Sequence, residues 1–431
     1  MPWYKKLHWQ IIIGLVLGLL YGVLAAAQGW GQFTSDWIAP FGQIFFRLLL
    51  LIAVPLVLAS LITGVASLSD LKKLSRIGGK TIAIYIGTTV VALVIGLVLV
   101  NLLNPGGSVP EEMREKLQMT FADQAEVGME NAAASAERGP LQPIVDMIPN
   151  NFFEAAGSNR NMLQVVFFAI FAGIGLLMIP REKAKPLLEF FDSLNDLIIK
   201  LVEIIMIFAP IGVFGLLADT ITSIAGDDLG QILELLGALG FYGIVVILGL
   251  AIHMTLTYGS MMKFLTPRKI SDFWKALGPA QLVAFSTSSS GATLPITMER
   301  CENNLGVSEE VSSFVLPLGA TINMDGTALY QAVAAVFIAQ TIGMELDLTA
   351  QITIVFTAVL ASIGTAAVPG AGIIMLVIIL EAVGVPIAGI ALILGVDRIL
   401  DMCRTVTNVT GDATVATVVA ASEGQLRDIP A

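Results

Sequence analysis

Long apolar runs separated by short polar segments dominate the chain. Runs of about 20 apolar residues recur, for example over 81–100 and 161–180, and such a run is typical of a helix that crosses a bilayer. A large soluble core would instead need helices with polar faces, which these runs lack. The hydropathy pattern predicts spans over 9–27, 38–66, 81–103, 143–179, 189–219, 228–263, 309–340 and 384–421.

Two further segments, 271–303 and 347–381, are apolar but interrupted. The first contains AFSTSSSGATLPIT at 284–297, and the second contains ASIGTAAVPGAGIIML at 361–376. Proline removes a helix donor and glycine frees the backbone, so both stretches should unwind. Irregular backbone survives at membrane depth only where protein or a water-filled cavity covers it. We therefore expect two re-entrant hairpins, with a solvent-exposed loop as the alternative for the serine-rich stretch.

Basic residues predict the topology. Loops 70–80 and 181–185 and segment 263–275 carry Lys and Arg, whereas loops 28–37, 219–229 and 343–350 carry none. Cytoplasmic loops are enriched in Lys and Arg, so both termini are expected in the cytoplasm, although loop 104–140 fits this alternation less cleanly. The first apolar run shows no small-residue cleavage site and is interpreted as an uncleaved first helix.

Composition narrows the function classes. Of 431 residues, 56% are hydrophobic and 13% are charged, against about 25% charged in a soluble domain. Two cysteines and two histidines form no zinc or haem spacing, and no GxxxxGK[ST] sequence supports ATP drive. No nucleophile–base pair is readable, so we do not expect an enzyme. The net charge of −11 gives no indication of a nucleic acid partner.

Polar residues of the last predicted span share one helix face. Asp397, Asp401, Arg404, Asn408 and Asp412 stand at i, i+4, i+7, i+11 and i+15, which places them within about 80° of one another. A solvated cytoplasmic helix is disfavoured because 413–421 is apolar again. A structural Asp401–Arg404 pair is a second alternative, but it explains two of the five residues. We favour a ligand site.

The residue types suit a zwitterionic, acidic ligand. The planar fork of Arg404 matches a carboxylate, and Asp401 matches an ammonium group. Asp325 lies in INMDGTALY at 322–330, inside an apolar run, where an unpaired carboxylate costs several kcal/mol. Asp325 and Asp412 lack basic partners in their own motifs, and hard oxygen ligands fit a small hard cation. In a transporter, Na⁺ is the expected cation.

Four motifs together resemble the signature stretches of the glutamate transporter family, the dicarboxylate/amino acid:cation symporters. They are SSSGATLP (288–295), NMDGTALY (323–330), ASIGTAAVPGAG (361–372) and DMCRTVTNVTGD (401–412), and LLNPGG (102–107) agrees as well. The resemblance covers essentially the whole chain in order and spacing.

The resemblance implies an all-α polytopic membrane protein with eight transmembrane helices, two re-entrant helical hairpins and inverted repeats. It implies a homotrimer in the cell membrane that works by an elevator mechanism. Segments 1–70 and 107–219 would form the scaffold, and segments 71–106 and 220–431 would form the transport domain.

The resemblance also implies the site residues. The substrate would contact Ser288, Ser289, Ser290, Thr327, Val368, Gly372, Asp401, Arg404, Thr405 and Asn408. One Na⁺ site would use Gly319, Asn323, Asn408 and Asp412; a second Thr321, Met324, Ser362, Ile363 and Thr365; a third Tyr85, Thr88, Thr89, Asn323 and Asp325.

Some positions depart from parts of the family. Gln331 stands where proton-coupled members have glutamate, so we expect sodium symport without proton coupling. Thr287 and Met402 stand where other members have arginine, and whether Arg398 supplies that charge stays open. The expected function is Na⁺-coupled uptake of aspartate or glutamate, which differ by one methylene and are not separated here. The alternatives are a C4-dicarboxylate symporter of the same fold, which Asp401 disfavours, and an anion-conducting channel.

Overall fold

The computed structural model describes residues 7–67, 75–109, 114–115, 145, 148–158, 161–225, 229–363 and 369–427. Across these ranges the regular structure is helical, and the β pairing found is one isolated bridge between Val307 and Leu426. Five helical stretches in this part of the chain are long and apolar enough to cross a membrane. The prediction of a polytopic helical membrane protein is confirmed, whereas the count of eight spans stays a prediction.

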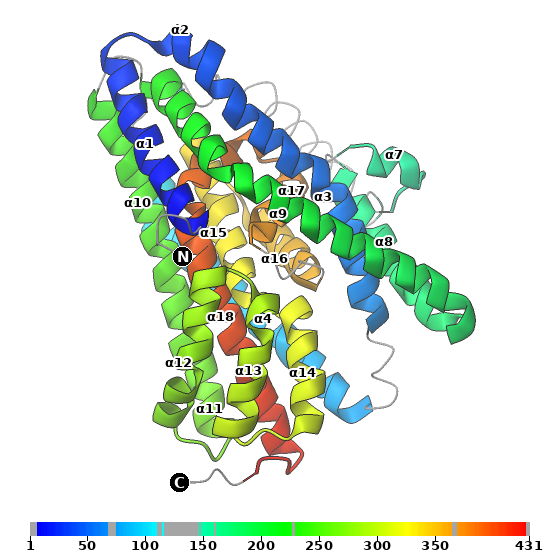
Figure 1. The fold of residues 1–431 in the computed structure, drawn as a ribbon. Coiled ribbons are helices and arrows are strands. Elements are labelled where there is room, and N and C mark those ends of the chain that lie inside the picture. Colours follow the sequence, from blue (N-terminus) through cyan, green and yellow to red (C-terminus); the bar gives the residue numbers. More distant parts are fainter. Residues whose placement is uncertain are drawn as a thin grey trace.

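Four N-terminal helices pack along one another. They are α1 (Leu7–Ala27), α3 (Ala39–Ser67), α8 (Met162–Met178) and the 45-residue α9 (Arg181–Ala225), which runs beside α1 and α3 (Figure 1). Glycines permit the closest approach, because a Cβ at Gly14 or Gly18 would overlap the α9 backbone at Pro210 and Phe214. Short α2 (Gly31–Phe33), a π-helical turn (Thr34–Ile38) and α7 (Phe152–Ala156) complete this group.

The C-terminal helices surround a buried pair, α15 (Asp325–Thr341) and α18 (Ile390–Ser422). Helix α4 (Ser75–Leu103) packs on α15 and ends in a 3-10 turn over Pro105–Ser108. Helix α10 (Leu229–Ile252) continues through a π-helical turn, His253–Tyr258, into α11 (Gly259–Leu265). A further 3-10 turn, Ile387–Gly389, precedes α18.

Two helical pairs pack on the buried helices, the first on α18 and the second on α15. Helices α12 (Ile270–Thr287) and α13 (Ser290–Asn304) meet at Ser288–Ser289, and Ser288 adopts a left-handed φ of 53°. Because Ser288 is 2% exposed, the serine-rich stretch is not a solvent loop. Helices α16 (Leu348–Ile363) and α17 (Ala371–Ala382) form the second pair, and residues 364–368 lie outside the described residues. Both predicted interruptions are present.

The predicted span 309–340 is matched by one apolar stretch over Glu309–Thr341, but its helix is interrupted. The chain forms α14 (Glu309–Ile322) and then α15, and Asn323 leaves the helix with φ −91° and ψ 93°. The side chain of Asn408 bonds the freed Gly326 N–H, which offsets the cost of breaking the helix at membrane depth. Likewise, the predicted span 143–179 contains two separate helices, α7 and α8.

Candidate functional site

Arg404 is the central side chain of the polar face of α18, and it is wholly buried. Its Nη2 donates to Asp401 Oδ1 at 2.7 Å, and its Nη1 lies 3.1 Å from Asp397 Oδ1. The guanidinium also lies over the Tyr330 ring, 3.8 Å from the centroid. The Asp401–Arg404 pair weighed above as a structural alternative is therefore present, and Asp397 is a second partner of the guanidinium.

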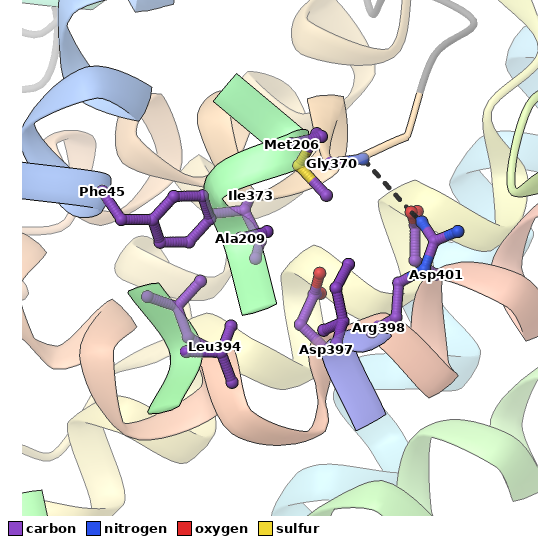
Figure 2. A pocket seen from close by; sticks show the side chains of 11 residues that line it. Phe45, Met206, Ala209, Gly370, Ile373, Leu394, Asp397, Arg398 and Asp401 are labelled. Carbon is purple, nitrogen blue, oxygen red and sulfur yellow. Dashed lines mark hydrogen bonds and ion pairs between the residues drawn. The ribbon is translucent and has the colours of Figure 1, made fainter. Parts of the chain in front are cut away.

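The other oxygen of Asp401 faces the second hairpin. Gly370 N–H donates to Asp401 Oδ2 at 3.1 Å, and Arg398 Nη1 lies 3.4 Å from the same oxygen. Figure 2 shows these groups at the edge of a pocket that Phe45 of α3 and residues of α9 also line. Arg398 therefore faces Asp401 and this pocket.

Asn408 connects the polar face of α18 to the α14–α15 break. Its Oδ1 accepts from Gly326 N–H at 2.8 Å, and its Nδ2 donates to Thr327 Oγ1 at 3.2 Å. The same Nδ2 lies 3.2 Å from Met324 Sδ. Gly326 permits this packing, because a Cβ there would overlap the carbonyl oxygen of Arg404.

Two of the expected substrate residues lie near Arg404. Gly372 of α17 and Thr327 of α15 are close to it, since a Cβ on Gly372 would be 3.2 Å from Arg404 Nη1 and 3.0 Å from the Thr327 methyl. Thr405 is buried but donates within its own helix to Asp401 O at 2.8 Å. Val368 lies outside the described residues.

Ser288, Ser289 and Ser290 are buried at the tip of the first hairpin. Ser289 caps α13 by accepting from Ala292 N–H at 3.1 Å, and Ser288 Oγ has no hydrogen-bond partner within the described ranges. Ser288 and Ser290 make no hydrogen bond to α18 in the described part of the chain. The hairpin nevertheless packs on α18, where Gln281 Nε2 donates to Thr410 Oγ1 at 3.0 Å.

Asp325 is wholly buried at the start of α15 and lies among three polar partners. Thr89 Oγ1 of α4 lies 2.6 Å from Oδ1. Tyr258 OH donates to Oδ2 at 2.8 Å, and His253 Nε2 lies 3.2 Å from Oδ2. No Lys or Arg side chain among the described residues forms an ion pair with Asp325.

Asp412 and Asn323 form the neighbouring polar pair. Asn323 Nδ2 donates to Asp412 Oδ1 at 2.8 Å, whereas Asn323 Oδ1 is buried without a hydrogen-bond partner in the described part. Gly319 lies against both Asp412 Oδ1 and Tyr85 OH, where a Cβ would overlap them. Tyr85 OH itself donates to Val315 O at 3.1 Å, and Thr88 Oγ1 to Tyr85 O at 3.1 Å.

These oxygens fit a small hard cation. The buried amide oxygen of Asn323 has no hydrogen-bond donor among the described residues, which is uncommon in folded proteins, and a bound cation would explain it. Two carboxylates without a guanidinium partner add the negative charge that Na⁺ would neutralise. The structure thus brings together the residues of the first and third expected sodium sites.

The second expected sodium site is less complete. Thr321 Oγ1 donates to Leu318 O at 2.9 Å and Ser362 Oγ to Val359 O at 3.0 Å, each within its own helix. Met324 lies at the helix break beside Asn408. Thr365 lies outside the described residues, as does the side chain of Ile363.

Sequence reasoning missed four partners in the site: Asp397, Tyr330, His253 and Tyr258. A histidine inside an apolar span was a usable signal, because an ionisable residue at membrane depth is costly. Asp397 was seen on the polar face, but a contact across i, i+7 depends on how the long Arg404 side chain turns. Tyr330 and Tyr258 carried no signal in their own positions.

Comparisons with known proteins agree with the motifs. The model of the sodium:dicarboxylate symporter family matches residues 7–422. The chain is 36% identical over 422 residues to the proton/sodium-glutamate symport protein of Geobacillus stearothermophilus, covering 98% of this chain and 96% of that one. It is 34% identical over 424 residues to the proton/glutamate-aspartate symporter of Escherichia coli (strain K12), with coverages of 96% and 92%.

A similar match reaches animal proteins. The chain is 36% identical over 452 aligned positions to excitatory amino acid transporter 3 of Homo sapiens, covering 95% of this chain and 84% of that one. The matched proteins are transporters and not enzymes, and several long apolar helices make this chain a multi-pass membrane protein. The chain belongs to the sodium:dicarboxylate symporter family.

Proposed function

We propose that this protein is a secondary active symporter that couples Na⁺ influx to the uptake of aspartate or glutamate. One observation carries the proposal: a wholly buried arginine, Arg404, lies beside Asp401 on the face of α18 that contacts the tip of the second hairpin. A guanidinium and a carboxylate on one face match the carboxylate and ammonium of an amino acid. The names of the relatives support acidic amino acids as the substrate class.

Arg404 must exchange partners when the substrate binds. A ligand carboxylate takes the place of Asp397 and Asp401 at the guanidinium, and Asp401 turns to the ligand ammonium. The exchange keeps Arg404 and Asp401 each paired with an opposite charge, and this matters because losing one partner of a buried ion pair costs about 3–5 kcal/mol. Ser288, Ser289, Ser290 and Asn408 hold the second ligand carboxylate, with Thr327, Val368, Gly372 and Thr405 lining the site.

Sodium binds at the oxygen-rich clusters next to the substrate. The best supported ligands are Tyr85, Thr88, Thr89, Gly319, Asn323, Asp325, Asn408 and Asp412, and a further site uses Thr321, Met324, Ser362, Ile363 and Thr365. Bound Na⁺ supplies the positive charge that Asp325 and Asp412 lack. The carbonyl oxygen of Asn408 accepts from Asn323, and its side chain donates to Thr327 of the expected substrate site, so ion binding at Asn323 would fix groups that the substrate contacts.

Transport follows an elevator mechanism. Segments 1–70 and 107–219 form a scaffold in a homotrimer, and segments 71–106 and 220–431 form the moving transport domain. The protein lies in the cell membrane, and both of its termini lie in the cytoplasm. The second hairpin closes over the ligand, and its contact from Gly370 N–H to Asp401 supports that role.

The proposed transport is coupled to sodium and not to protons. Gln331 is buried on α15 and its Nε2 donates to Gly372 O at 2.9 Å. A side-chain amide neither gains nor loses a proton near neutral pH, so Gln331 cannot couple transport to proton flux. The names of two relatives include protons, so a proton gradient is one arm of the test.

A C4-dicarboxylate symporter is the second candidate, and one observation favours it. Gly370 N–H and Arg398 both approach Asp401 Oδ2, so this carboxylate has partners even when the ligand has no ammonium. An anion-conducting channel would use the same charges without accumulating substrate.

The deciding experiment is uptake into proteoliposomes. Radiolabelled aspartate, glutamate and succinate are supplied separately, with Na⁺, H⁺ or K⁺ gradients imposed one at a time. We expect concentrative uptake of aspartate or glutamate driven by an inward Na⁺ gradient. Succinate uptake of equal efficiency would favour the dicarboxylate symporter, and flux that only equilibrates would favour a channel.

A further inference from the structure

The π-helical turn His253–Tyr258 joins α10 to α11 and faces the carboxylate of Asp325. We propose that this turn is a positioning element of the cation site. His253 and Tyr258 together hold Asp325 Oδ2, so that Oδ1 is the oxygen turned toward the cation. The inference rests on the proposed function, since it adds two residues to one of its ion sites.

The π-helical geometry is what brings the two side chains together. In an α-helix, residues five apart point about 140° away from each other. A π-helix closes its hydrogen bonds from i to i+5, so residues 253 and 258 share a face, and such turns are frequent at functional sites. Both side chains are wholly buried, and their rings meet edge-on with centroids 4.6 Å apart.

The two oxygens of Asp325 are used unequally. Oδ2 lies 2.8 Å from Tyr258 OH and 3.2 Å from His253 Nε2, whereas Oδ1 has one hydrogen-bond partner among the described residues, Thr89 Oγ1 at 2.6 Å. A carboxylate oxygen accepts about two hydrogen bonds. Two donors therefore saturate Oδ2, and Oδ1 keeps one acceptor position on the side of α4.

Thr89 can release Oδ1 without losing its own hydrogen bond. Its Oγ1 lies 2.8 Å from Tyr85 O as well as 2.6 Å from Asp325 Oδ1. A hydroxyl has a single hydrogen and can donate to one of these acceptors at a time. When the hydrogen turns to Tyr85 O, the lone pairs of Thr89 Oγ1 and Asp325 Oδ1 both face the cation.

The turn is also in contact with the second carboxylate region. A Cβ on Gly411 of α18 would overlap both Tyr258 OH and Asn323 Nδ2. Tyr258 thus lies next to the residue that precedes Asp412 and next to the amide that bonds Asp412. Fixing Tyr258 therefore fixes the distance between Asp325 and the Asn323–Asp412 pair.

A purely structural role, in which His253 only supplies a hydrogen bond to the buried Asp325 carboxylate, explains this residue poorly. The Nε2–H tautomer is required, because two acceptors cannot face each other across 3.2 Å. Its Nδ1 is buried with no hydrogen-bond partner in the described part of the chain. An unsatisfied buried polar atom carries a cost and is uncommon in structures, so a role in shaping the site accounts for it better.

The test measures sodium binding without transport. Full-length protein in detergent is titrated with NaCl against choline chloride in the absence of amino acid, and the rise in unfolding temperature reports occupancy. The variants are Tyr258→Phe, His253→Leu and His253→Gln, whose amide restores a donor. Tyr242→Phe removes a buried hydroxyl from α10, the helix that leads into the π-helical turn, and is the matched control.

The positioning role predicts a graded result. Hydrogen bonds to charged groups contribute about 1.5–3 kcal/mol, so Tyr258→Phe and His253→Leu should raise the half-saturating sodium concentration about tenfold or more. His253→Gln should recover most of this shift, and Tyr242→Phe should show none. The Kd for aspartate at saturating sodium should change less than about twofold in all four.

Two results would overturn the inference, and they are distinguishable. If wild-type protein binds sodium and both Tyr258→Phe and His253→Leu keep its half-saturating concentration, the turn is purely structural, even if both variants unfold at lower temperature. Should His253→Leu fail to fold, Tyr258→Phe decides alone. If wild-type protein shows no sodium response at all, the proposed function fails and the inference with it.

Discussion

Two polar clusters lie side by side along α18, and they differ in their countercharge. The guanidinium cluster contains Asp397, Arg398, Asp401 and Arg404, in which two carboxylates are neutralised by two arginines. The carboxylate cluster contains Asn323, Asp325 and Asp412, whose partners within the described ranges are neutral polar groups apart from His253. Both clusters are buried, so the difference does not come from access to solvent.

The difference indicates what each cluster can bind. A balanced cluster can accept a ligand only by exchanging partners, and a zwitterion with an extra carboxylate offers both partners at once. An unbalanced cluster of oxygens gains most from a cation, because burial makes its uncompensated charge costly. The substrate and the ion are thus assigned by charge balance, and the predictions below test that assignment.

The largest effect is expected from Arg404→Ala. It leaves Asp397 and Asp401 buried without their guanidinium, and losing one partner of a buried pair costs about 3–5 kcal/mol. Uptake of aspartate and glutamate should fall more than about a hundredfold. Arg404→Lys keeps the charge but loses the planar fork and should recover little. Normal uptake by Arg404→Ala in proteoliposomes would remove the guanidinium cluster from the substrate site.

A large effect on sodium is expected from the carboxylate cluster. Asp325→Asn keeps the size of the side chain but removes its charge, and Asp325→Ala removes the oxygens as well. Both should abolish sodium-driven uptake. In a sodium-binding titration of the purified variants, the half-saturating sodium concentration should rise at least about tenfold. Asp219→Asn on α9, outside both clusters, is the control. Unchanged sodium dependence in Asp325→Ala would refute the role of this carboxylate.

Asp401→Asn should change selectivity more than total transport. Without the carboxylate, the ligand ammonium loses its partner, and the affinity for aspartate should fall about tenfold. Succinate carries no ammonium and should lose less. The measurement is the ratio of the two inhibition constants against radiolabelled glutamate uptake. An equal loss for both ligands would mean that Asp401 acts only as a partner of Arg404.

The smallest effect is expected from Arg398→Met. Arg398 Nη1 lies 3.4 Å from Asp401 Oδ2, a longer contact than the 2.7 Å bond from Arg404. Aspartate affinity should therefore change by about threefold or less. A loss as large as that of Arg404→Ala would show that the two arginines form one functional unit.

Sequence periodicity predicted the face of α18 because a long, regular helix fixes the direction of every side chain. The two hairpin interruptions were also predictable, since serine, glycine and proline act on the local backbone. Both features depend on residues close in the sequence.

The break at Asn323–Met324 and the π-helical turn at 253–258 were not predictable in the same way. Each depends on partners far along the chain, such as Asn408 for Gly326 and Asp325 for Tyr258. The position of the Arg404 guanidinium was likewise not predictable from the sequence. The helix face placed Asp397 and Asp401 near Arg404, but the guanidinium is also packed against Tyr330 and Gly372, which lie on other helices.

We expect substrate to bind at the guanidinium cluster, sodium to bind at the carboxylate cluster, and the two binding events to be coupled. The most direct test is the dependence of aspartate affinity on sodium concentration. Purified protein is titrated with aspartate at several sodium concentrations, with choline as the replacement ion. Since Asn408 bonds both Asn323 of the carboxylate cluster and Thr327 of the expected substrate site, the Kd for aspartate should fall steeply as sodium rises. A Kd that stays constant from sodium-free to saturating sodium would contradict the coupling of the two clusters.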